Sequence, residues 1–267
     1  MMIDDRHPPK RGAEAPVLEL RGVHKRYGAF DAVQGIDLEV GRGEVFGFLG
    51  PNGAGKTTTL RMVTGLLRPT SGTIRVSGHD VVHASIEARR RIGFISDRPF
   101  LYDKLTGGEF LRFVGGLWGM SPAAIEAAAE RWMDRFDMLG WIGEPIESYS
   151  HGMRQRVLLC SALIHQPSLL VMDEPMVGLD PRGSSRLKQV VRELADEHGM
   201  SVVLSTHTLD VVEQVCDTVA IIHRGRIVAD GTLDQVQSGG PGRSGKHRRL
   251  EQIFLELTAG QEAHGGD

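Results

Sequence analysis

The residues from Gly50 to Thr57 have the types and the spacing that bind phosphate. They read GPNGAGKT and fit the pattern G-x-x-x-x-G-K-S/T at every fixed position. Glycines let successive backbone N–H groups turn toward phosphate oxygens, and a helix that follows adds its positive N-terminus. In this pattern the lysine reaches the β- and γ-phosphates, and the hydroxyl after it ligates Mg²⁺. We therefore predict phosphate contacts from Gly50, Pro51, Asn52, Gly53, Ala54, Gly55, Lys56, Thr57 and Thr58, with Thr57 also a metal ligand.

Two acids end an apolar stretch later in the chain. Asp173 and Glu174 follow the run Leu169 to Met172. A strand that ends in carboxylates brings them to the carboxyl edge of a parallel sheet, where α/β proteins bind ligands. Acids after a strand often only belong to a solvated loop or cap a helix. Because the same chain also has a phosphate-binding loop, a catalytic role for these two acids is favoured. We then predict that Asp173 holds the hydration shell of Mg²⁺. Glu174 is predicted to act as the general base or to orient the attacking water.

A single histidine follows another apolar stretch. His207 comes just after Val202 to Ser205. A lone histidine is more often structural, but this one ends a strand that we expect in the same sheet. From there its side chain can reach the γ-phosphate edge, so we predict a catalytic role for it.

The elements that must position these residues alternate between strands and helices. Val45 to Leu49 leads into the glycine loop, and Leu60, Val63 and Leu67 then recur at helical spacing. Nearer the N-terminus, Val17 to Val23 and Gly35 to Val40 alternate between apolar and polar residues, which is typical of half-buried antiparallel strands. Later strands are expected at 169–172, 202–205, 219–223 and 226–229, with helices at 183–198 and 209–216 between them. This alternation predicts a mostly parallel sheet.

The region from about residue 98 to 165 has a different character. Its alanine-rich and periodic stretches favour helices, and Pro122 suits a first helical turn after the N-cap candidate Ser121. We interpret it as an inserted helical segment. At the two ends, we predict a disordered lead-in over residues 1–16 and, over 236–267, a flexible Gly/Ser-rich linker with a final helix.

Composition limits the classes of function. The chain has 267 residues and a net charge of -3, so a basic footprint for nucleic acid is absent. We predict that the two cysteines, Cys160 and Cys216, are buried thiols. The N-terminal residues have no apolar signal-peptide core, and no run approaches the ~20 apolar residues of a membrane helix. We therefore expect a cytoplasmic protein that reaches a membrane only through a partner.

Together these motifs resemble the ABC ATPase family over about Val17 to Leu233. Tyr149 to Arg156 (YSHGMRQR) is similar to the family signature loop, and Gly178-Leu179-Asp180 is similar to its D-loop. The resemblance implies an α/β fold: a P-loop NTPase core with a mixed, mostly parallel sheet, an antiparallel β subdomain and an inserted α-helical subdomain. It also implies an ABC ATPase domain at 17–235 whose helical insertion covers about 98–165, and further nucleotide contacts from Tyr27, Ser150, His151, Gly152 and Asp180.

In that family each subunit carries half of a catalytic site. Tyr27 is expected to stack on adenine, while Ser150 and Gly152 bind the γ-phosphate held by a second subunit. ATP then joins two chains head to tail, and hydrolysis releases them. The resemblance implies ATP and Mg²⁺ as ligands and a second ATPase subunit as partner. We expect that subunit to be identical, and a heterodimer is the alternative.

The chain departs from the family pattern in two loops. Asp97 stands where the family has a glutamine, and we expect it still to sense Mg²⁺ or water. His151 and Met153 replace a glycine and a glutamine of the signature loop. With Phe100 to Thr106 upstream, this variant is similar to cassettes of the ABC-2 type export branch. We expect the segment Phe100 to Leu105 to contact a cytoplasmic helix of a permease; the alternative is that Phe100 and Leu101 pack inside the helical insertion.

We therefore predict an ATP-binding and ATP-hydrolysing subunit of an ABC transporter, peripheral on the inner face of the cell membrane through integral permease subunits, with export favoured. The alternative is a non-transport ABC ATPase that acts on the ribosome or DNA. Those proteins carry two cassettes, a long coiled coil or a strong basic surface, and this sequence has none of the three. A GTPase or small-molecule kinase would need an Asn-Lys-x-Asp guanine reader, which is absent.

Overall fold

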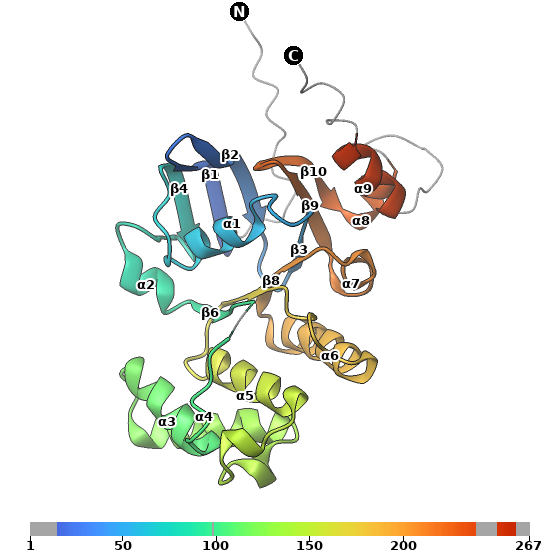
Figure 1. The fold of residues 1–267 in the computed structure, drawn as a ribbon. Helices are drawn as coiled ribbons and strands as arrows, with labels where there is room; N and C mark the ends of the chain where they lie inside the picture. The colour runs from blue at the N-terminus through green and yellow to red at the C-terminus, as the bar shows by residue number, and fades with distance from the viewer. Residues whose placement is uncertain (1–14, 98, 239–249, 260–267) are drawn as a thin grey trace, which may run out of the picture.

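The structure is a computed structural model that describes residues 15–97, 99–238 and 250–259. Of the lead-in predicted for residues 1–16, residues 1–14 lie outside the described residues. Of the linker and final helix predicted for residues 236–267, residues 239–249 and 260–267 lie outside them as well. Within the described part, two β-sheets lie at one end of the molecule and a group of helices lies at the other (Figure 1).

The strands form the two sheets that the sequence predicts. One is antiparallel, in the order β2 (Phe30–Val40), β1 (Leu18–Tyr27), β4 (Ser71–Val76) and β5 (His79–Asp80). The other has the order β10 (Arg226–Thr232), β9 (Thr218–His223), β3 (Val45–Leu49), β8 (Ser201–Thr206), β7 (Leu169–Asp173) and β6 (Ile92–Ile95). All its neighbours are parallel except β9 and β10, so the predicted mixed, mostly parallel sheet is confirmed.

The central strands are buried on both faces. Every residue of β3, β7, β8 and β9 is buried, because both faces of these strands pack against other elements. Side chains of β3 alternate between two cores: Phe46 and Phe48 pack in one, and Val45 and Leu49 in the other. The first core includes Leu60 of α1 (Lys56–Val63), and the second includes residues of α6 (Pro181–His198) and α7 (Leu209–Val215).

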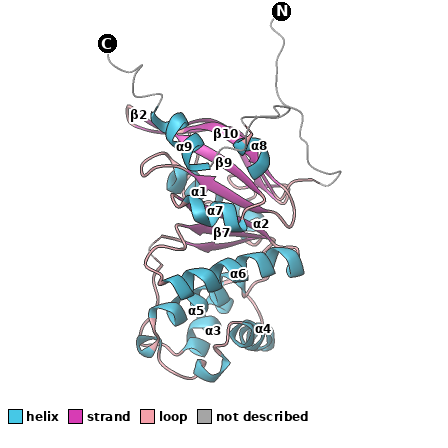
Figure 2. Cartoon of the chain, turned by 90° about the vertical axis from the view of Figure 1, so that its right-hand side faces the viewer, coloured by secondary structure: helices cyan, strands magenta, loops and turns pink. Residues whose placement is uncertain are grey.

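Three helices make up the group at the far end from the antiparallel sheet. They are α3 (Gly107–Leu117), α4 (Pro122–Arg135) and α5 (His151–Leu163), with short 3-10 turns at Leu139–Trp141 and Ile146–Ser148. Figure 2 shows α6 lying between these helices and the strand β7. The predicted signals start α4: Ser121 accepts a hydrogen bond from the Ala124 N–H, and Pro122 fills the first turn.

The structure differs from the sequence prediction in the ends of two strands and in two short helices. β1 and β2 run as far as Tyr27 and Phe30, beyond the predicted ends at Val23 and Gly35. Their pairing contains register shifts, which break the alternation of apolar and polar residues that the prediction used. The helices α2 (Ser85–Arg89) and α8 (Leu233–Gln237) were not predicted, because five residues are too few to display a helical period.

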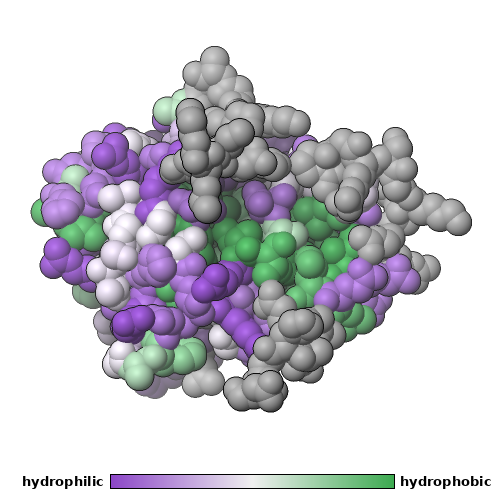
Figure 3. All heavy atoms as spheres, turned by 90° about the horizontal axis from the view of Figure 1, so that it is seen from above, coloured by the Kyte–Doolittle hydropathy of each residue, from purple (hydrophilic) through white to green (hydrophobic). Residues whose placement is uncertain are grey.

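The predicted final helix is present as α9 (Leu250–Ala259). Its Leu250 and Ile253 are buried, and the helix packs against α7, α8 and β9. Seen from above, this end of the molecule mixes hydrophilic surface with a hydrophobic area near its middle (Figure 3). Cys160 and Cys216 are buried free thiols as predicted, and burial raises the pKa of each.

His165 connects the helical group to the parallel sheet. It follows α5, its ring stacks on Trp118 at the end of α3 with centroids 4.1 Å apart, and its Nε2 lies 3.0 Å from the Ile92 carbonyl oxygen. Its Nδ1 is buried without a hydrogen-bond partner in the described part of the chain. Burial therefore lowers the pKa of His165 below its ordinary value of 6.5.

We expect this histidine to make the fold less stable in mild acid. As the pH falls below about 6.5, the unfolded chain takes up a proton on His165 while the folded chain resists it. Its contribution is thus fully present above that pH and is lost as the pH falls through the lower folded pKa. Urea unfolding between pH 7.5 and pH 5.5 should give a shallower loss of stability for His165→Gln than for the unsubstituted chain. The exposed His83→Gln is the control, and equal slopes in all three would refute the assignment.

Candidate nucleotide-binding site

The glycine loop joins β3 to α1 in a conformation that its residues require. Gly55 has a φ of 112°, and a Cβ there would lie 2.7 Å from the Ala32 carbonyl oxygen. A Cβ on Gly50 would lie 2.5 Å from the carbonyl oxygen of Ile222. Side chains at either position would collide with backbone, so the loop can pass between β2 and β9 only with glycines there. The loop then delivers Lys56 as the first residue of α1.

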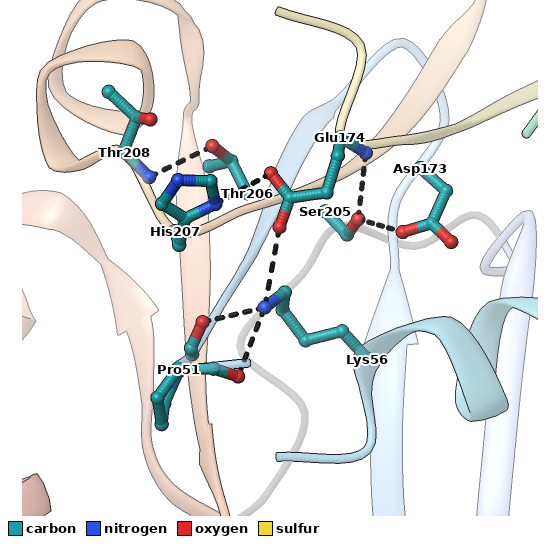
Figure 4. A network of polar contacts seen from close by, with 9 residues as sticks. Pro51, Lys56, Asp173, Glu174, Ser205, Thr206, His207 and Thr208 are labelled. Carbon is teal, nitrogen blue, oxygen red and sulfur yellow. Dashed lines mark hydrogen bonds and ion pairs between the residues drawn. The ribbon is translucent and has the colours of Figure 1, made fainter. Parts of the chain in front are cut away.

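Lys56 is a buried cation held by the loop that precedes it. Its side chain is 6% exposed, and its Nζ donates hydrogen bonds to the carbonyl oxygens of Gly50 at 2.6 Å and Pro51 at 3.2 Å. Its Nζ also lies 3.4 Å from Oε1 of Glu174 (Figure 4). A buried ammonium of this kind needs an anionic partner, and Glu174 is the partner in this structure.

Glu174 joins the loop to two neighbouring strands. It follows β7, and its backbone N–H donates to the carbonyl oxygen and the hydroxyl of Ser205 on β8, at 3.2 Å and 3.1 Å. Its φ of 49° lies in the left-handed region, which costs energy for a residue with a side chain. Its Oε2 lies 3.0 Å from Nδ1 of His207, so one carboxylate contacts both the predicted phosphate lysine and the predicted histidine.

Asp173 lies behind this pair and is 1% exposed. Its Oδ1 accepts a hydrogen bond from the hydroxyl of Ser205, the same side chain that receives the Glu174 N–H (Figure 4). Ser205 thus holds both acids at the ends of the paired strands β7 and β8. Sequence reasoning missed Ser205, although a hydroxyl ending an otherwise apolar strand beside His207 is a detectable signal.

Lys56 and Glu174 line a pocket of about 390 Å³, whereas Asp173 and Ser205 are not among its lining residues. Of the predicted residues, it is lined by Tyr27, Asn52, Gly53, Gly55, Lys56, Thr57, Thr58, Asp97 and Glu174. Gly50, Pro51 and Ala54 belong to the same loop, and His207 reaches the pocket through its contact with Glu174. Phe30 and Ala32 also line it and were not predicted. A second cavity, of about 440 Å³ between α4 and the end of α6, contains none of these residues.

Four predicted residues lie away from this pocket. Ser150 is the N-cap of α5 and accepts a hydrogen bond from the Met153 N–H at 3.3 Å; His151 and Gly152 follow it in the first turn. Asp180 is the N-cap of α6 and accepts from the Gly183 N–H at 2.7 Å. The two loops approach each other, because a Cβ on Gly178 would lie 3.6 Å from Nε2 of His151. None of the four lines the 390 Å³ pocket of the same chain.

The ABC transporter family model matches residues 33–177, which span the glycine loop, the Ser150 loop and both acids. The chain belongs to the ABC transporter family. The cassette is 41% identical over 217 residues to the daunorubicin resistance ATP-binding protein DrrA3 of Streptomyces coeruleorubidus, covering 81% of this chain and 68% of the relative. It is 37% identical over 216 residues to the linearmycin resistance ATP-binding protein LnrL of Bacillus subtilis, covering 81% and 69%.

The solved structures agree with this membership. One described as the ATP-binding subunit of an ABC transporter superposes with a TM-score of 0.79 at 32% identity, covering 90% of this chain and 99% of the other. The cassette is therefore an ATPase, the ATP-binding and ATP-hydrolysing subunit of an ABC transporter, and the alternative of a ribosome- or DNA-acting protein has no support. No helix of the described residues is long and apolar enough to cross a membrane.

The residues of the cassette fit Mg²⁺ bound together with a nucleotide. Among the described residues no cluster of three or more His, Cys, Asp or Glu side chains could hold a metal alone. One buried carboxylate, Asp173, and the hydroxyl of Thr57 beside Lys56 instead match the usual Mg²⁺ arrangement, in which one or two protein oxygens join substrate phosphates and water. Such a site would form only when a triphosphate supplied its share of the ligands.

Proposed function

We propose that this cassette powers export of a small molecule through a separate ABC-2 type permease, and that it works as a head-to-tail homodimer with two composite ATP sites. The relatives are named for resistance to daunorubicin and to linearmycin, which supports an export role. One observation carries the composite site: Lys56 and Glu174 line a pocket of their own chain from which Ser150, His151, Gly152 and Asp180 are absent.

In the proposed reaction Lys56 binds the β- and γ-phosphates and Glu174 orients and deprotonates the attacking water. These two side chains form an ion pair before ATP arrives, at 3.4 Å. The γ-phosphate then takes the place of the Glu174 carboxylate on the ammonium, which frees the carboxylate to act as a base. His207, already 3.0 Å from Glu174, is within reach of the same phosphate.

Thr57 and Asp173 would hold Mg²⁺ between them and the phosphates, with Asp97 at the pocket wall as a sensor of metal or water. Bound Mg²⁺ would neutralise charge that develops on the phosphate oxygens. Ser205 fixes Asp173 from behind by donating its hydroxyl hydrogen to the carboxylate. Ser205 thus holds the two acids together, although it does not itself line the pocket.

The second half of the site would come from the partner chain. Ser150 and the backbone N–H groups of His151 and Gly152, at the N-terminus of the 13-residue helix α5, suit an incoming γ-phosphate. Asp180 lies on the adjoining loop and would reach across the same interface. Because ATP would contact both chains, its binding should drive dimerisation and its hydrolysis should reverse it.

An exposed aromatic patch suits the permease. It consists of Phe100, Tyr102 and Phe113; the ring of Tyr102 lies edge-on to each phenylalanine ring, with centroids 5.3 Å apart. Phe100 is 76% exposed whereas Leu101 is buried, so the alternative of both packing in the helical group holds only for Leu101. Arg154 of α5 pairs with Asp103 beside the patch at 2.6 Å. A cytoplasmic helix of the permease would bind this patch on the inner face of the membrane. It would contact the loop that the Arg154–Asp103 ion pair joins to α5, the helix that begins after Ser150.

Ser150→Arg is expected to abolish ATP-dependent dimerisation. The measurement is the mass, by light scattering, of Glu174→Gln with ATP and Mg²⁺, with and without Ser150→Arg. A large cation at the interface would block the contact with the partner's nucleotide, and the mass should stay that of a monomer. The matched control is Ser121→Arg, because Ser121 caps α4 through an equally long 3.3 Å hydrogen bond and should cost the same in helix capping.

The oligomeric states of these variants distinguish the possible roles of Ser150. A dimer in Glu174→Gln and Ser121→Arg but not in Ser150→Arg supports the composite site and the homodimer. A dimer that survives Ser150→Arg contradicts the role of Ser150. A chain that binds ATP and yet stays monomeric without any Ser150 substitution contradicts the ATP-driven homodimer.

A further inference from the structure

The helix that follows His207 is short and has little stability of its own. α7 begins two residues after His207 and has seven residues, and the side chain of Thr208 at its N-cap accepts no hydrogen bond from the helix. The Thr208 N–H instead donates to the hydroxyl of Thr206 at 3.0 Å (Figure 4). Because isolated helices of this length are marginal in water, neighbouring elements must fix the place of α7.

Apolar contacts hold α7 against α6, which lies beside it (Figure 1). The residues that the two helices bury in one shared core are aliphatic and include Leu187, Val190, Val191, Val211, Val212 and Val215. Such contacts hold the helices together but carry little directional information. Hydrogen bonds are directional, so polar contacts between the helices can fix the rotation of α7 and its position along α6.

A ring of three polar side chains joins the two helices. Lys188 of α6 donates from Nζ to Oδ2 of Asp210 and to Oε1 of Gln214, both at 2.9 Å. Gln214 donates from Nε2 to Oδ1 of Asp210 at 2.6 Å, which closes the ring. The Lys188 side chain is only 16% exposed, and its hydrogen bond is the largest cause that lowers the pKa of Asp210. Because each member is held by the other two, this ring fixes geometry better than a single exposed ion pair does.

A second cation of α6 holds the other end of α7. Arg192 donates from Nη1 to the Val215 carbonyl oxygen at 3.2 Å and to Oδ1 of Asp217 at 2.9 Å. Lys188 and Arg192 are four residues apart, so they lie on the same face of α6. One face of α6 therefore holds α7 near both of its ends.

α6 and α7 each begin beside a part of the proposed composite site. α6 begins after Asp180, which is proposed to reach the partner chain, and α7 begins just after His207. The His207 side chain is 49% exposed, and among the described residues its hydrogen-bond partner is Glu174, at 3.0 Å. The direction of this side chain therefore depends on how the backbone between β8 and α7 is held.

We propose that Lys188 is a positioning residue for ATP hydrolysis: through Asp210 and Gln214 it fixes α7, and thereby the direction in which His207 points toward Glu174 and the γ-phosphate. Lys188 itself does not line the 390 Å³ pocket. The inference rests on the proposed role of His207 and adds a residue of α6 on which that role depends. A misplacement of about 1 Å at a reacting centre can cost about 10²-fold in rate, so a smaller displacement of His207 should cost about tenfold.

The test removes the ammonium and follows the reaction. Lys188→Met keeps the apolar stem of the side chain, and in the full chain it should lower kcat for ATP hydrolysis about tenfold. Kd for ATP, from isothermal titration, should stay within about twofold, because the contact acts on the reaction and not on binding. The charge swap Lys188→Glu/Asp210→Lys should restore most of kcat. Arg135→Met is the matched control, because Arg135 pairs with Glu197 of α6 at 2.7 Å but joins α6 to α4.

Two further measurements separate positioning of His207 from a general loss of stability. In the His207→Ala background, Lys188→Met should lower kcat no further, because the effects of residues that act through one another are not additive. The imidazole resonances of His207, in protein isotope-labelled at histidine, should shift in Lys188→Met and not in Arg135→Met. They should return toward their original positions in the charge swap.

Three results would overturn the inference and leave the nucleotide site as proposed. They are a Lys188→Met chain whose kcat and His207 resonances are unchanged, a further fall of kcat when Lys188→Met is added to His207→Ala, and an equal loss of kcat in Arg135→Met. If His207→Ala hydrolyses ATP as fast as the unsubstituted chain, the proposed role of His207 is wrong and the inference falls with it.

Discussion

Glu174→Gln is expected to lower the rate of ATP hydrolysis by about 10²- to 10⁴-fold, the usual contribution of a general base. Glutamine keeps the size of the side chain and can still contact His207, which lies 3.0 Å from Oε2, but it cannot accept a proton from water. Phosphate release measures the rate, and Glu130→Gln, an exposed residue of α4, is the control.

The same substitution should not weaken ATP binding. Glu174 is the carboxylate beside Lys56 in the absence of nucleotide, so it competes with the γ-phosphate for the ammonium and repels it by charge. Removing that charge should leave Kd for ATP equal or lower. A rate close to that of the unsubstituted chain would exclude Glu174 as the base, and a much higher Kd would mean that it binds nucleotide instead.

Lys56→Met is expected to weaken ATP binding by about 10- to 100-fold, because a hydrogen bond between charged groups contributes about 1.5–3 kcal/mol. Methionine keeps the apolar stem of a side chain that is only 6% exposed, so the packing of α1 should survive. Equilibrium binding of ATP measures the effect. Adenosine, which lacks phosphates, should bind equally weakly to both chains and serves as the ligand control.

The Lys56→Met chain should also be less stable without nucleotide, because Glu174 then keeps a carboxylate of 15% exposure with no cation beside it. The double variant Lys56→Met/Glu174→Gln removes both charges and should recover part of that stability while ATP binding stays weak. Recovery of ATP binding in the double variant would show that Lys56 acts only by balancing Glu174. Its assignment as the phosphate ligand would then be wrong.

Local chemistry accounts for the features that were predicted correctly. The glycine loop is recognisable because each of its functions depends on residues within eight positions, and the backbone at Gly50 and Gly55 tolerates no side chain. The N-cap Ser121 is recognisable for the same reason, since it accepts a hydrogen bond from an N–H three residues away. The order of strand, loop and helix follows from periodicity over one element.

Pairing between strands that are distant in the sequence decided which site residues contact one another. The apolar strands β3, β7, β8 and β9 are all fully buried, so no pattern within them reveals that β8 lies between β3 and β7. That order brings Glu174 next to both Lys56 and His207, which are 118 and 33 positions away in the sequence. Ser205 gains its role only because β8 pairs with β7.

The sequence by itself therefore determined the glycine loop between a strand and a helix, the two acids at the end of an apolar strand, and the family, since these depend on residue types and spacing over short ranges. Only the tertiary structure decided which side chains meet: the ion pair of Lys56 with Glu174 and the separation of Ser150 from the pocket of its own chain. The physical reason is that strand order and register are set by the packing of whole faces against one another, and a single strand's residues do not carry that information.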